Sequence, residues 1–198
     1  MTAPISIATL KKRIRQHRYV PIVPNEADIR AAVLVPFYTI GDELYVVFTK
    51  RTMHMSMQKG HVSFPGGRRE PGDKDLLETA LRESHEEIGL DPRHVEILGR
   101  IDDFSTRDGA IFIAGFVGLI DAKACPYAWC PAEREVAEML EVPVKHLLDP
   151  ANVVVEPPRE LNGRMWPNET FVFRGHRIFG ATARATRHVL DILLGTDH

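Results

Sequence analysis

The sequence lacks the features that mark secreted and membrane proteins. It has two cysteines in 198 residues, Cys125 and Cys130, and no second Cys or His pair at zinc-ligand spacing. A disulfide framework and a structural zinc site are therefore not expected, and both residues are predicted to be free thiols. No apolar run approaches the roughly 20 residues of a membrane span. The apolar stretch 5–10 precedes the basic stretch 11–13, the reverse of a secretory signal, so we expect a cytoplasmic protein without a membrane partner.

An excess of positive charge is also missing. The chain has 25 Lys and Arg against 27 Asp and Glu, which gives a formal net charge of −2. Proteins that bind nucleic acid through its phosphates normally show a basic excess, so no nucleic-acid partner is expected. The length and a hydrophobic fraction of 44% are typical of one domain with a substantial core. We expect a single domain over 1–198, with a core from about 28 to 195 and a helical extension over 1–27.

Hydrophobic periodicity predicts a mixture of helices and strands. Helices are expected over residues 6–18, 75–89, 133–140 and 181–194, and strands over 31–38, 44–49, 95–98 and 111–120. Gly41 and Asp42 join the first two strands as a hairpin, a loop follows over 53–72, and Gly115 and Gly118 are candidate β-bulges. Because these elements show no regular βαβ alternation, the expected fold class is α+β with a mixed sheet.

The helix over 75–89 carries a cluster of acids. Glu83 and Glu87 lie one turn apart and Glu86 is three residues after Glu83, so three carboxylates share one face. They lie near the helix end, where the macrodipole disfavours negative charge by about 0.3–1 kcal/mol each, and only Arg82 offsets them locally. A solvated acidic face would leave this repulsion uncompensated, whereas a divalent cation such as Mg²⁺ or Mn²⁺ removes it.

The residues around this helix resemble the Nudix box, G-x5-E-x7-R-E-U-x-E-E-x-G-U with U aliphatic. Its second half is matched by residues 82–90, Arg-Glu-Ser-His-Glu-Glu-Ile-Gly-Leu. The first half departs from the pattern, because Asp73 stands where Glu is usual and eight rather than seven residues separate it from Arg82. Ser84 also replaces an aliphatic residue or Ala. The resemblance implies the Nudix fold, an α/β/α sandwich with a mixed sheet flanked by helices, and a pyrophosphohydrolase activity.

Flanking segments narrow the resemblance to the coenzyme A pyrophosphatase type of Nudix hydrolase. The matching stretches, which keep that type's spacing and most of its identities, are 47–52, Gly60, 64–67, 135–143 and 178–183. Three positions depart from the type: Ser56 replaces an Arg, Gln58 a common His, and His61 a common Gln or Glu. If that Arg holds a nucleotide phosphate, its loss weakens the coenzyme A assignment and leaves diphosphate hydrolysis intact.

The resemblance implies metal ligands and catalytic residues on the helix. Mg²⁺ or Mn²⁺ would be held by Glu83, Glu86 and Glu87, with Glu83 and Glu87 as principal ligands and Glu86 as ligand or general base. Arg82 would orient Glu86, although a plain intrahelical ion pair explains the same spacing. The general base is left open between these glutamates and an acid from elsewhere. The additional candidate acids are Asp73, Glu135 and Glu138.

Substrate contacts are expected before the helix. The candidates are Arg51, Gly60, Phe64, Pro65, Gly66 and Gly67. The glycines would let backbone N–H groups approach a diphosphate, and Arg51 would reach a phosphate; a tight packing turn and a strand-capping Arg are the alternatives. Met53, Met55 and Met57 fit either an apolar wall for a pantetheine arm or ordinary edge packing.

The favoured hypothesis is a metal-dependent hydrolase that cleaves coenzyme A or its acyl thioesters into 4′-phosphopantetheine and 3′,5′-ADP, as the resemblance implies. ADP-ribose, a dinucleotide or a nucleoside triphosphate are the alternative substrates. A non-catalytic nucleotide-binding regulatory domain is disfavoured because all three box glutamates are present. The expected partner is a small nucleoside-diphosphate substrate, and the resemblance also allows a homodimer.

Overall fold

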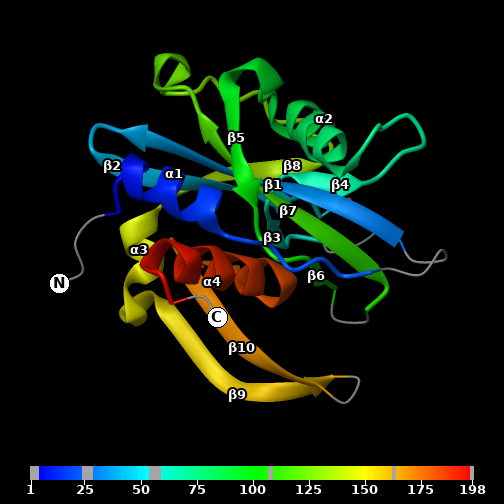
Figure 1. The fold of residues 1–198 in the computed structure, drawn as a ribbon, viewed down its shortest axis with the longest axis vertical. Helices are drawn as coiled ribbons and strands as arrows, with labels where there is room; N and C mark the ends of the chain where they lie inside the picture. The colour runs from blue at the N-terminus through cyan, green and yellow to red at the C-terminus, as the bar shows by residue number, and fades with distance from the viewer. Residues whose placement is uncertain (1–4, 24–28, 54–58, 107–108, 162–163, 197–198) are drawn as a thin grey trace.

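The computed structural model describes residues 5–23, 29–53, 59–106, 109–161 and 164–196. Its main sheet has eight strands, five of which form the path β3-β2-β1-β7-β5 (Figure 1). On this path β1 and β7 are parallel and the other neighbours are antiparallel, so the sheet is mixed. The other three strands pair at its sides, β4 with β1, β6 with β7 and β8 with β2. The bounds are β1 Ile29–Ile40, β2 Glu43–Arg51, β3 Val62–Ser63, β4 Gly66–Arg68, β5 Val95–Arg100, β6 Phe104–Ser105, β7 Ile111–Ile120 and β8 Val136–Pro143.

Strand β1 lies in the middle of the sheet and is buried on both faces. A two-residue turn at Gly41, with φ +59°, joins it to β2 and confirms the predicted hairpin. Val35 and Phe37 belong to one apolar core, whereas Leu34 and Tyr38 belong to a second core on the opposite face. Alternate side chains of a strand point to opposite faces, so this continuous apolar run places a layer of structure on each side of the sheet.

Helix α2 (Leu76–Ile88) covers one face. Asp75 caps its first turn by accepting the backbone N–H of Glu78 at 2.9 Å, and Gly89 ends it in the left-handed conformation with φ 70°. Its apolar stripe packs on β1 and β4. This packing brings the adjoining acidic stripe to the start of β4, which is the arrangement on which the functional site depends.

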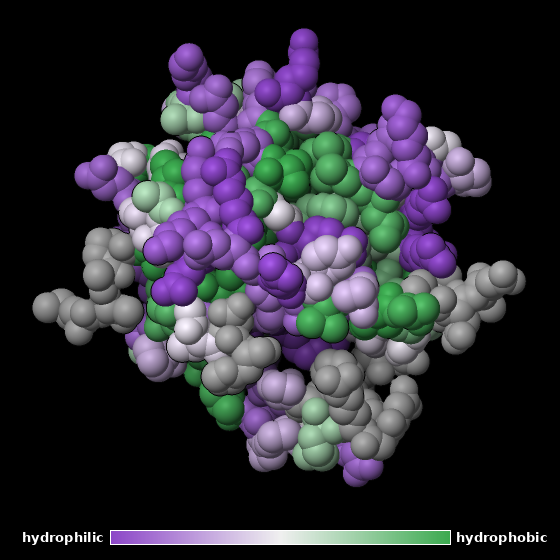
Figure 2. Space-filling model, viewed as in Figure 1, coloured by the Kyte–Doolittle hydropathy of each residue, from purple (hydrophilic) through white to green (hydrophobic). Residues whose placement is uncertain are grey.

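The other face is covered by α1, α4 and a three-stranded sheet of order β11-β10-β9 (Figure 1). Helices α1 and α4 contact each other, and Lys11 and Arg15 of α1 form ion pairs with Glu96 of β5. Hydrophilic side chains gather over α1, with apolar patches between them (Figure 2). The bounds are α1 Ile7–Gln16, α3 Val144–Leu148, α4 Gly180–Leu194, β9 Val153–Leu161, β10 Arg164–Phe173 and β11 His176–Ile178, with single 3₁₀ turns at Pro92–His94, Ala122–Ala124 and Pro150–Asn152.

The helix expected over 133–140 is wrong, because this segment leads into strand β8. Leu140 and Val142 alternate into the core while the strand pairs antiparallel with β2 along its length. Val136 and Leu140, four residues apart, fit a helical face equally well, and the free edge of β2 decides between the two structures. The loop expected over 53–72 also contains β3 and β4, and strands β9 to β11 were not expected.

Gly115 and Gly118 are not β-bulges. Strand β7 keeps an unbroken register with β1, and the irregularity falls in β5, between Ile97 and Gly99. A Cβ on Gly115 would lie 2.5 Å from the side chain of Ile101, and one on Gly118 would meet its neighbours as closely. These glycines therefore serve close packing of neighbouring side chains over the strand.

The expected fold class is confirmed. A mixed sheet flanked by helices is the predicted α+β fold. Cys125 and Cys130 are free thiols. Within the described ranges, no helix is long and apolar enough to cross a membrane.

Candidate active site

Glu87 is a buried acid on the inner side of α2. Its side chain is 5% exposed, and one carboxylate oxygen accepts the backbone N–H of Gly66 at 3.1 Å. The other oxygen lies 3.7 Å from Nη1 of Arg51. Burial raises the pKa of Glu87 to about 7, because the contacts with Gly66 and Arg51 only partly offset the loss of solvent.

Glu83 lies one turn earlier, and its carboxylate packs against Gly67. Burial also raises the pKa of this carboxyl, although Nη1 of Arg82, at 3.1 Å, opposes the shift. A Cβ on Gly67 would lie 2.4 Å from the Glu83 carboxylate, and a Cβ on Gly66, whose φ is +149°, would lie 2.3 Å from the carbonyl oxygen of Ala32. Glycine at position 66 therefore lets β4 pack against β1, and glycine at position 67 leaves room for the Glu83 carboxylate.

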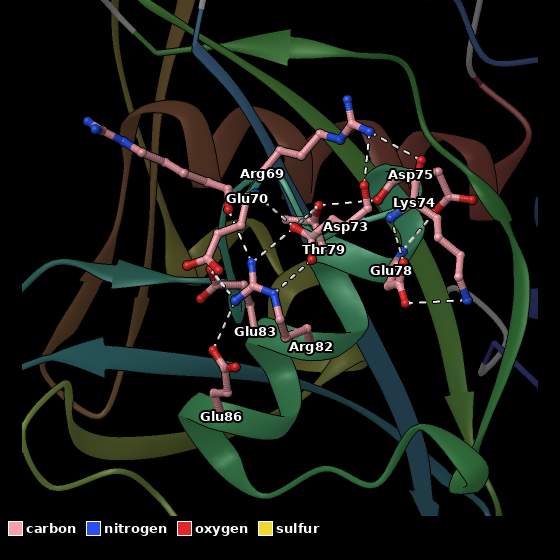
Figure 3. A network of polar contacts seen from close by, with 11 residues as sticks. Arg69, Glu70, Asp73, Lys74, Asp75, Glu78, Thr79, Arg82, Glu83 and Glu86 are labelled. Atoms are coloured by element: carbon pink, nitrogen blue, oxygen red, sulfur yellow. Dashed lines mark hydrogen bonds and ion pairs between the residues drawn. The ribbon is translucent and has the colours of Figure 1, made fainter.

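Arg82 is the centre of an ionic network that joins Glu83 to Asp73 and Glu86 (Figure 3). Its guanidinium donates to both carboxylate oxygens of Asp73, at 2.9 and 3.1 Å, and to Glu86 at 2.9 Å. Asp73 is almost fully buried and also accepts the hydroxyl of Thr79 at 2.8 Å and the backbone N–H of Glu70 at 2.9 Å. These donors, Arg82 above all, hold the pKa of Asp73 well below its usual range.

The network separates the three carboxylates that the sequence placed on one face. Glu83 and Glu87 line the same cavity, whereas the Glu86 side chain is 57% exposed, pairs with Arg82 and lies outside the cavity walls. Asp73 also lies outside those walls. The predicted contact between Arg82 and Glu86 is present, and the contact between Arg82 and Asp73, which the sequence did not indicate, anchors it.

The cavity has a volume of about 920 Å³ and lies between the main sheet, the β9–β10 hairpin and the start of α4. Of the substrate contacts expected from the sequence, those in its walls are Arg51, Phe64, Gly66 and Gly67. Pro65 and Gly60 are not wall residues: the Pro65 carbonyl accepts the N–H of Leu34 at 2.9 Å, and Gly60 lies in a turn with φ +68°. Ser56, Gln58, Met55 and Met57 fall outside the described residues.

The two additional acids beyond the helix differ in position. Glu135 lines the cavity, and within the described part of the chain no hydrogen bond or ion pair engages its carboxylate. Glu138 is not a wall residue and instead lies 3.8 Å from Lys50 and 3.3 Å from His176. Only Glu135 therefore shares a space with Glu83 and Glu87.

A second wall of the cavity comes from residues that the sequence did not indicate. Asn168 donates to the Glu156 carboxylate at 2.8 Å, and Arg184 of α4 donates to the carbonyl of Ser105 at 2.7 Å. Burial lowers the pKa of the Arg184 guanidinium. Arg177 lies on β11, and the consecutive antiparallel strands β9 to β11 were not predicted from the sequence. The only signal toward this wall was the resemblance at 178–183.

The donor set fits a hard divalent cation. Glu83 and Glu87, whose pKa values are both raised by burial, line one cavity together with Glu135. Of the two guanidinium groups beside them, that of Arg82 is shared with Asp73 and Glu86. Carboxylate oxygens are the ligands that Mg²⁺ and Mn²⁺ prefer, and such ions commonly bind through one or two carboxylates together with substrate phosphates.

Comparison with known proteins identifies the family. The model of the NUDIX domain matches residues 28–161, more than half of the chain. The chain is 35% identical over 143 residues to the peroxisomal coenzyme A diphosphatase NUDT7 of Mus musculus, covering 72% of this chain and 57% of the relative. It is 32% identical over 162 residues to the uncharacterized Nudix hydrolase NudL of Yersinia pestis (strain Pestoides F), covering 81% and 77%. The chain thus spans just over half the length of the mouse relative.

Solved structures agree at the level of the fold. The Nudix hydrolase RenU from M. smegmatis aligns with a TM-score of 0.57 and 16% identity over 92% of each chain. A MutT/nudix family protein from Enterococcus faecalis aligns with a TM-score of 0.56 and 13% identity over 96% of this chain and 70% of its own. These findings confirm the family and the fold class predicted from the sequence: the chain belongs to the Nudix family.

Proposed function

We propose that this chain is a metal-dependent hydrolase of coenzyme A or acyl-coenzyme A. The products would be 3′,5′-ADP and 4′-phosphopantetheine, the latter still carrying its acyl group when the substrate is a thioester. The observation that carries the proposal is the pair Glu83 and Glu87 in the wall of a cavity of about 920 Å³, against the backbone of Gly66 and Gly67. Small-molecule sites usually measure about 300–1,000 Å³. The substrate is supported by the 35% identity to a protein named as a coenzyme A diphosphatase.

Glu83 and Glu87 would hold Mg²⁺ or Mn²⁺. Glu86, on the same helical turn, is the third candidate ligand, and its carboxylate pairs with Arg82 outside the cavity. A bound divalent cation would neutralise charge on the phosphoryl oxygens and lower the pKa of the attacking water. Arg82 is a positioning residue, because its bonds to Asp73 fix the guanidinium that contacts both Glu83 and Glu86. Arg51 lines the cavity beside Glu87 and its side chain is 21% exposed, so its guanidinium can donate to a substrate phosphate.

The reaction transfers one phosphoryl group to water. The water oxygen forms a bond to one phosphorus of the P–O–P linkage, and the bond from that phosphorus to the bridging oxygen breaks. The bridging oxygen leaves with the other phosphate. We assign the proton of the attacking water to the Glu135 carboxylate, because it shares the cavity with Glu83 and Glu87 and is not engaged by a described side chain.

The walls also suit the two ends of the proposed substrate. Phe64, which stacks on Phe48 with ring centroids 4.6 Å apart, gives the cavity a rigid apolar surface for a pantetheine arm. Arg177 and Arg184 give the second wall positive charge toward phosphate groups. Among the alternatives, ADP-ribose and dinucleotides share the diphosphate with coenzyme A and lack its pantetheine arm.

A substrate panel tests the proposal. Purified chain in Mg²⁺ is given coenzyme A, acetyl-coenzyme A, dephospho-coenzyme A, ADP-ribose and diadenosine phosphates, and kcat/KM is compared. Coenzyme A or its thioester is expected to give the highest value. A higher value for ADP-ribose or a dinucleotide would overturn the substrate assignment. Glu83→Gln and Glu87→Gln are expected to lower turnover at least about 100-fold, while Glu78→Gln, in the first turn of the same helix, keeps it. Full activity of either cavity variant would overturn the metal assignment.

A further inference from the structure

A second group of potential metal ligands lies away from the cavity glutamates. His17 follows α1, Asp102 lies between β5 and β6, and His188 is on α4. One ligand atom from each of the three lies within 4.8 Å of the others, and no other described residues form such a group. The fold thus places two imidazoles and one carboxylate, from segments that are distant in the sequence, next to one another.

The distances in this group are close to those of a coordination site. Nε2 of His17 lies 3.0 Å and Nε2 of His188 lies 3.6 Å from the same oxygen, Oδ1 of Asp102. Ligand atoms placed about 2.0–2.2 Å from a tetrahedral Zn²⁺ are roughly 3.3–3.6 Å apart. The two imidazole rings meet edge to face, with centroids 5.3 Å apart.

The hydrogen bonds around the group favour the ligand form of its side chains. The backbone N–H of Asp102 donates to Nε2 of His188 at 3.3 Å, so this nitrogen carries a lone pair, as a metal ligand must. The backbone N–H of Val20 donates to Asp102 Oδ1 at 2.8 Å and orients the carboxylate. The His17 side chain is only 8% exposed, so its ring has little freedom to turn away.

We propose that His17, Asp102 and His188 bind a Zn²⁺-type transition-metal ion, with water completing the coordination. Imidazole nitrogen combined with one carboxylate suits Zn²⁺ and its neighbours, whereas Mg²⁺ prefers oxygen ligands alone. Binding replaces two hydrogen bonds, the one between His17 and Asp102 and the one from the Asp102 backbone N–H to His188 Nε2, and any proton on His17 Nε2 is released to solvent. The ion therefore differs in chemistry from the one assigned to Glu83 and Glu87.

The position of this site gives it a structural effect on the cavity. Asp102 lies two residues before Phe104, a cavity wall residue, and His188 lies one helical turn after Arg184, another wall residue. Arg184 in turn donates to the carbonyl of Ser105 in β6. A bound ion would fix the end of α1, the β5–β6 connection and α4 against each other behind that wall.

Calorimetric titration of Zn²⁺ tests the proposal on the full chain after treatment with a chelator, in excess Mg²⁺ and without substrate. One equivalent is expected to bind the wild type and to raise its Tm. His17→Asn and His188→Asn are expected to weaken Zn²⁺ binding at least about tenfold, and His94→Asn, an exposed histidine, keeps it. The proposal would be overturned if the wild type bound no Zn²⁺ equivalent, or if both site variants bound Zn²⁺ as the wild type does. Either result would mean that the three side chains only form hydrogen bonds with one another.

Two further measurements keep the result separate from the glutamate site and from misfolding. The Glu83→Gln/Glu87→Gln double variant is expected to retain the Zn²⁺ equivalent, and its loss there would place the ion at the glutamates and overturn the proposal. Co²⁺ bound to wild type is expected to show visible absorption bands that disappear in His188→Asn, whose Tm without metal reports whether it is folded. Persistence of the bands in folded His188→Asn would exclude His188 as a ligand.

Discussion

Arg82 binds Asp73 through two parallel hydrogen bonds, from Nε to Oδ1 at 2.9 Å and from Nη2 to Oδ2 at 3.1 Å. The same guanidinium reaches Glu83 and Glu86, so a buried acid before the helix holds the cation that organises the acids within it. Eight residues separate Asp73 from Arg82, one more than in the usual Nudix box. The loop before α2 is long enough for the Asp73 side chain to contact Arg82 all the same. The departure in spacing is therefore compatible with a fully bonded network.

The first prediction concerns this pair and pH. Because the pKa of Asp73 is lowered by folding, its ionised form stabilises the protein above its ordinary value of 3.8, and the contribution is lost as pH falls through the lower folded-state pKa. Asp73→Asn is expected to lower Tm at pH 7, with a difference from wild type that narrows steadily below about pH 4. Glu70→Gln, on the same loop, serves as the control with an exposed side chain. A Tm difference for Asp73→Asn that is constant from pH 3 to pH 7 would contradict the assignment.

The second prediction concerns how much the ionised Glu87 carboxylate destabilises the folded protein when no cation is bound. Folding raises the pKa of this carboxyl from 4.5 to about 7, so the folded state is destabilised by its ionisation as pH rises through that interval. In EDTA at pH 8, the free energy of unfolding of Glu87→Gln is expected to exceed that of the wild type by about 1–3 kcal/mol. Below pH 4.5 the two values are expected to be nearly equal. Urea unfolding at the two pH values measures the difference. Exposed Glu86→Gln is the control, and a wild type more stable than Glu87→Gln at pH 8 would refute the reasoning.

The third prediction compares Gly67 of β4 with Gly72 of the turn that follows this strand. A Cβ on Gly67 would lie 2.4 Å from the Glu83 carboxylate, whereas a Cβ on Gly72 would have nothing within 4 Å. Gly67→Ala is expected to remain folded, because the clash is with the end of a side chain, and to lower kcat/KM about 100-fold by displacing Glu83. Gly72→Ala is expected to keep wild-type activity. Equal activity of the two variants would show that the position of Glu83 does not limit the reaction.

The sequence was sufficient where the signals are local. A helix was predicted over 75–89, and α2 begins after its cap at Asp75 and ends at Gly89, because its period and its terminal glycine are signals that act within a few residues. The hairpin at Gly41 was predicted for the same reason. Glu83 and Glu87 were assigned to one site because four residues make one helical turn, and the cavity contains both.

The sequence was insufficient where a distant partner decides the structure. Residues 136–143 form a strand because β2 offers its edge, and nothing within the segment distinguishes that outcome from a helix. The exposure of Glu86 follows from the placement of Asp73 beside Arg82, which requires the three-dimensional course of the loop. Glu135 and Glu138, three residues apart, were equivalent candidates until the strand placed one in the cavity and the other beside Lys50.

The fourth prediction follows from that difference. Glu135→Gln removes the proposed proton acceptor and is expected to lower kcat about 100-fold or more while Mg²⁺ binding is retained. Glu138→Gln is the matched control, because it makes the same chemical change outside the cavity. The pH profile of kcat provides the readout, since the variant is expected to lose the acid limb that a general base produces. An unchanged profile in Glu135→Gln would assign the proton to another acid.

The fifth prediction concerns the second wall. Arg184 comes from α4 and contacts β6, on the side of the cavity away from α2, so it is placed for a phosphate distant from the cleaved linkage. Coenzyme A carries a 3′-phosphate that dephospho-coenzyme A lacks. Arg184→Gln is therefore expected to reduce the preference for coenzyme A over dephospho-coenzyme A about tenfold, because a charge-assisted hydrogen bond to phosphate is lost.

Arg187 is the matched control for this experiment. It lies on the same helix, pairs with Glu169 at 2.7 Å and is not a wall residue, so Arg187→Gln is expected to leave the substrate ratio unchanged. An equal loss of activity toward both substrates in Arg184→Gln would place this guanidinium at the diphosphate instead. Tm separates either result from a loosened wall, because Arg184 also donates to the carbonyl of Ser105, and a change in packing alone would lower Tm without changing the substrate ratio.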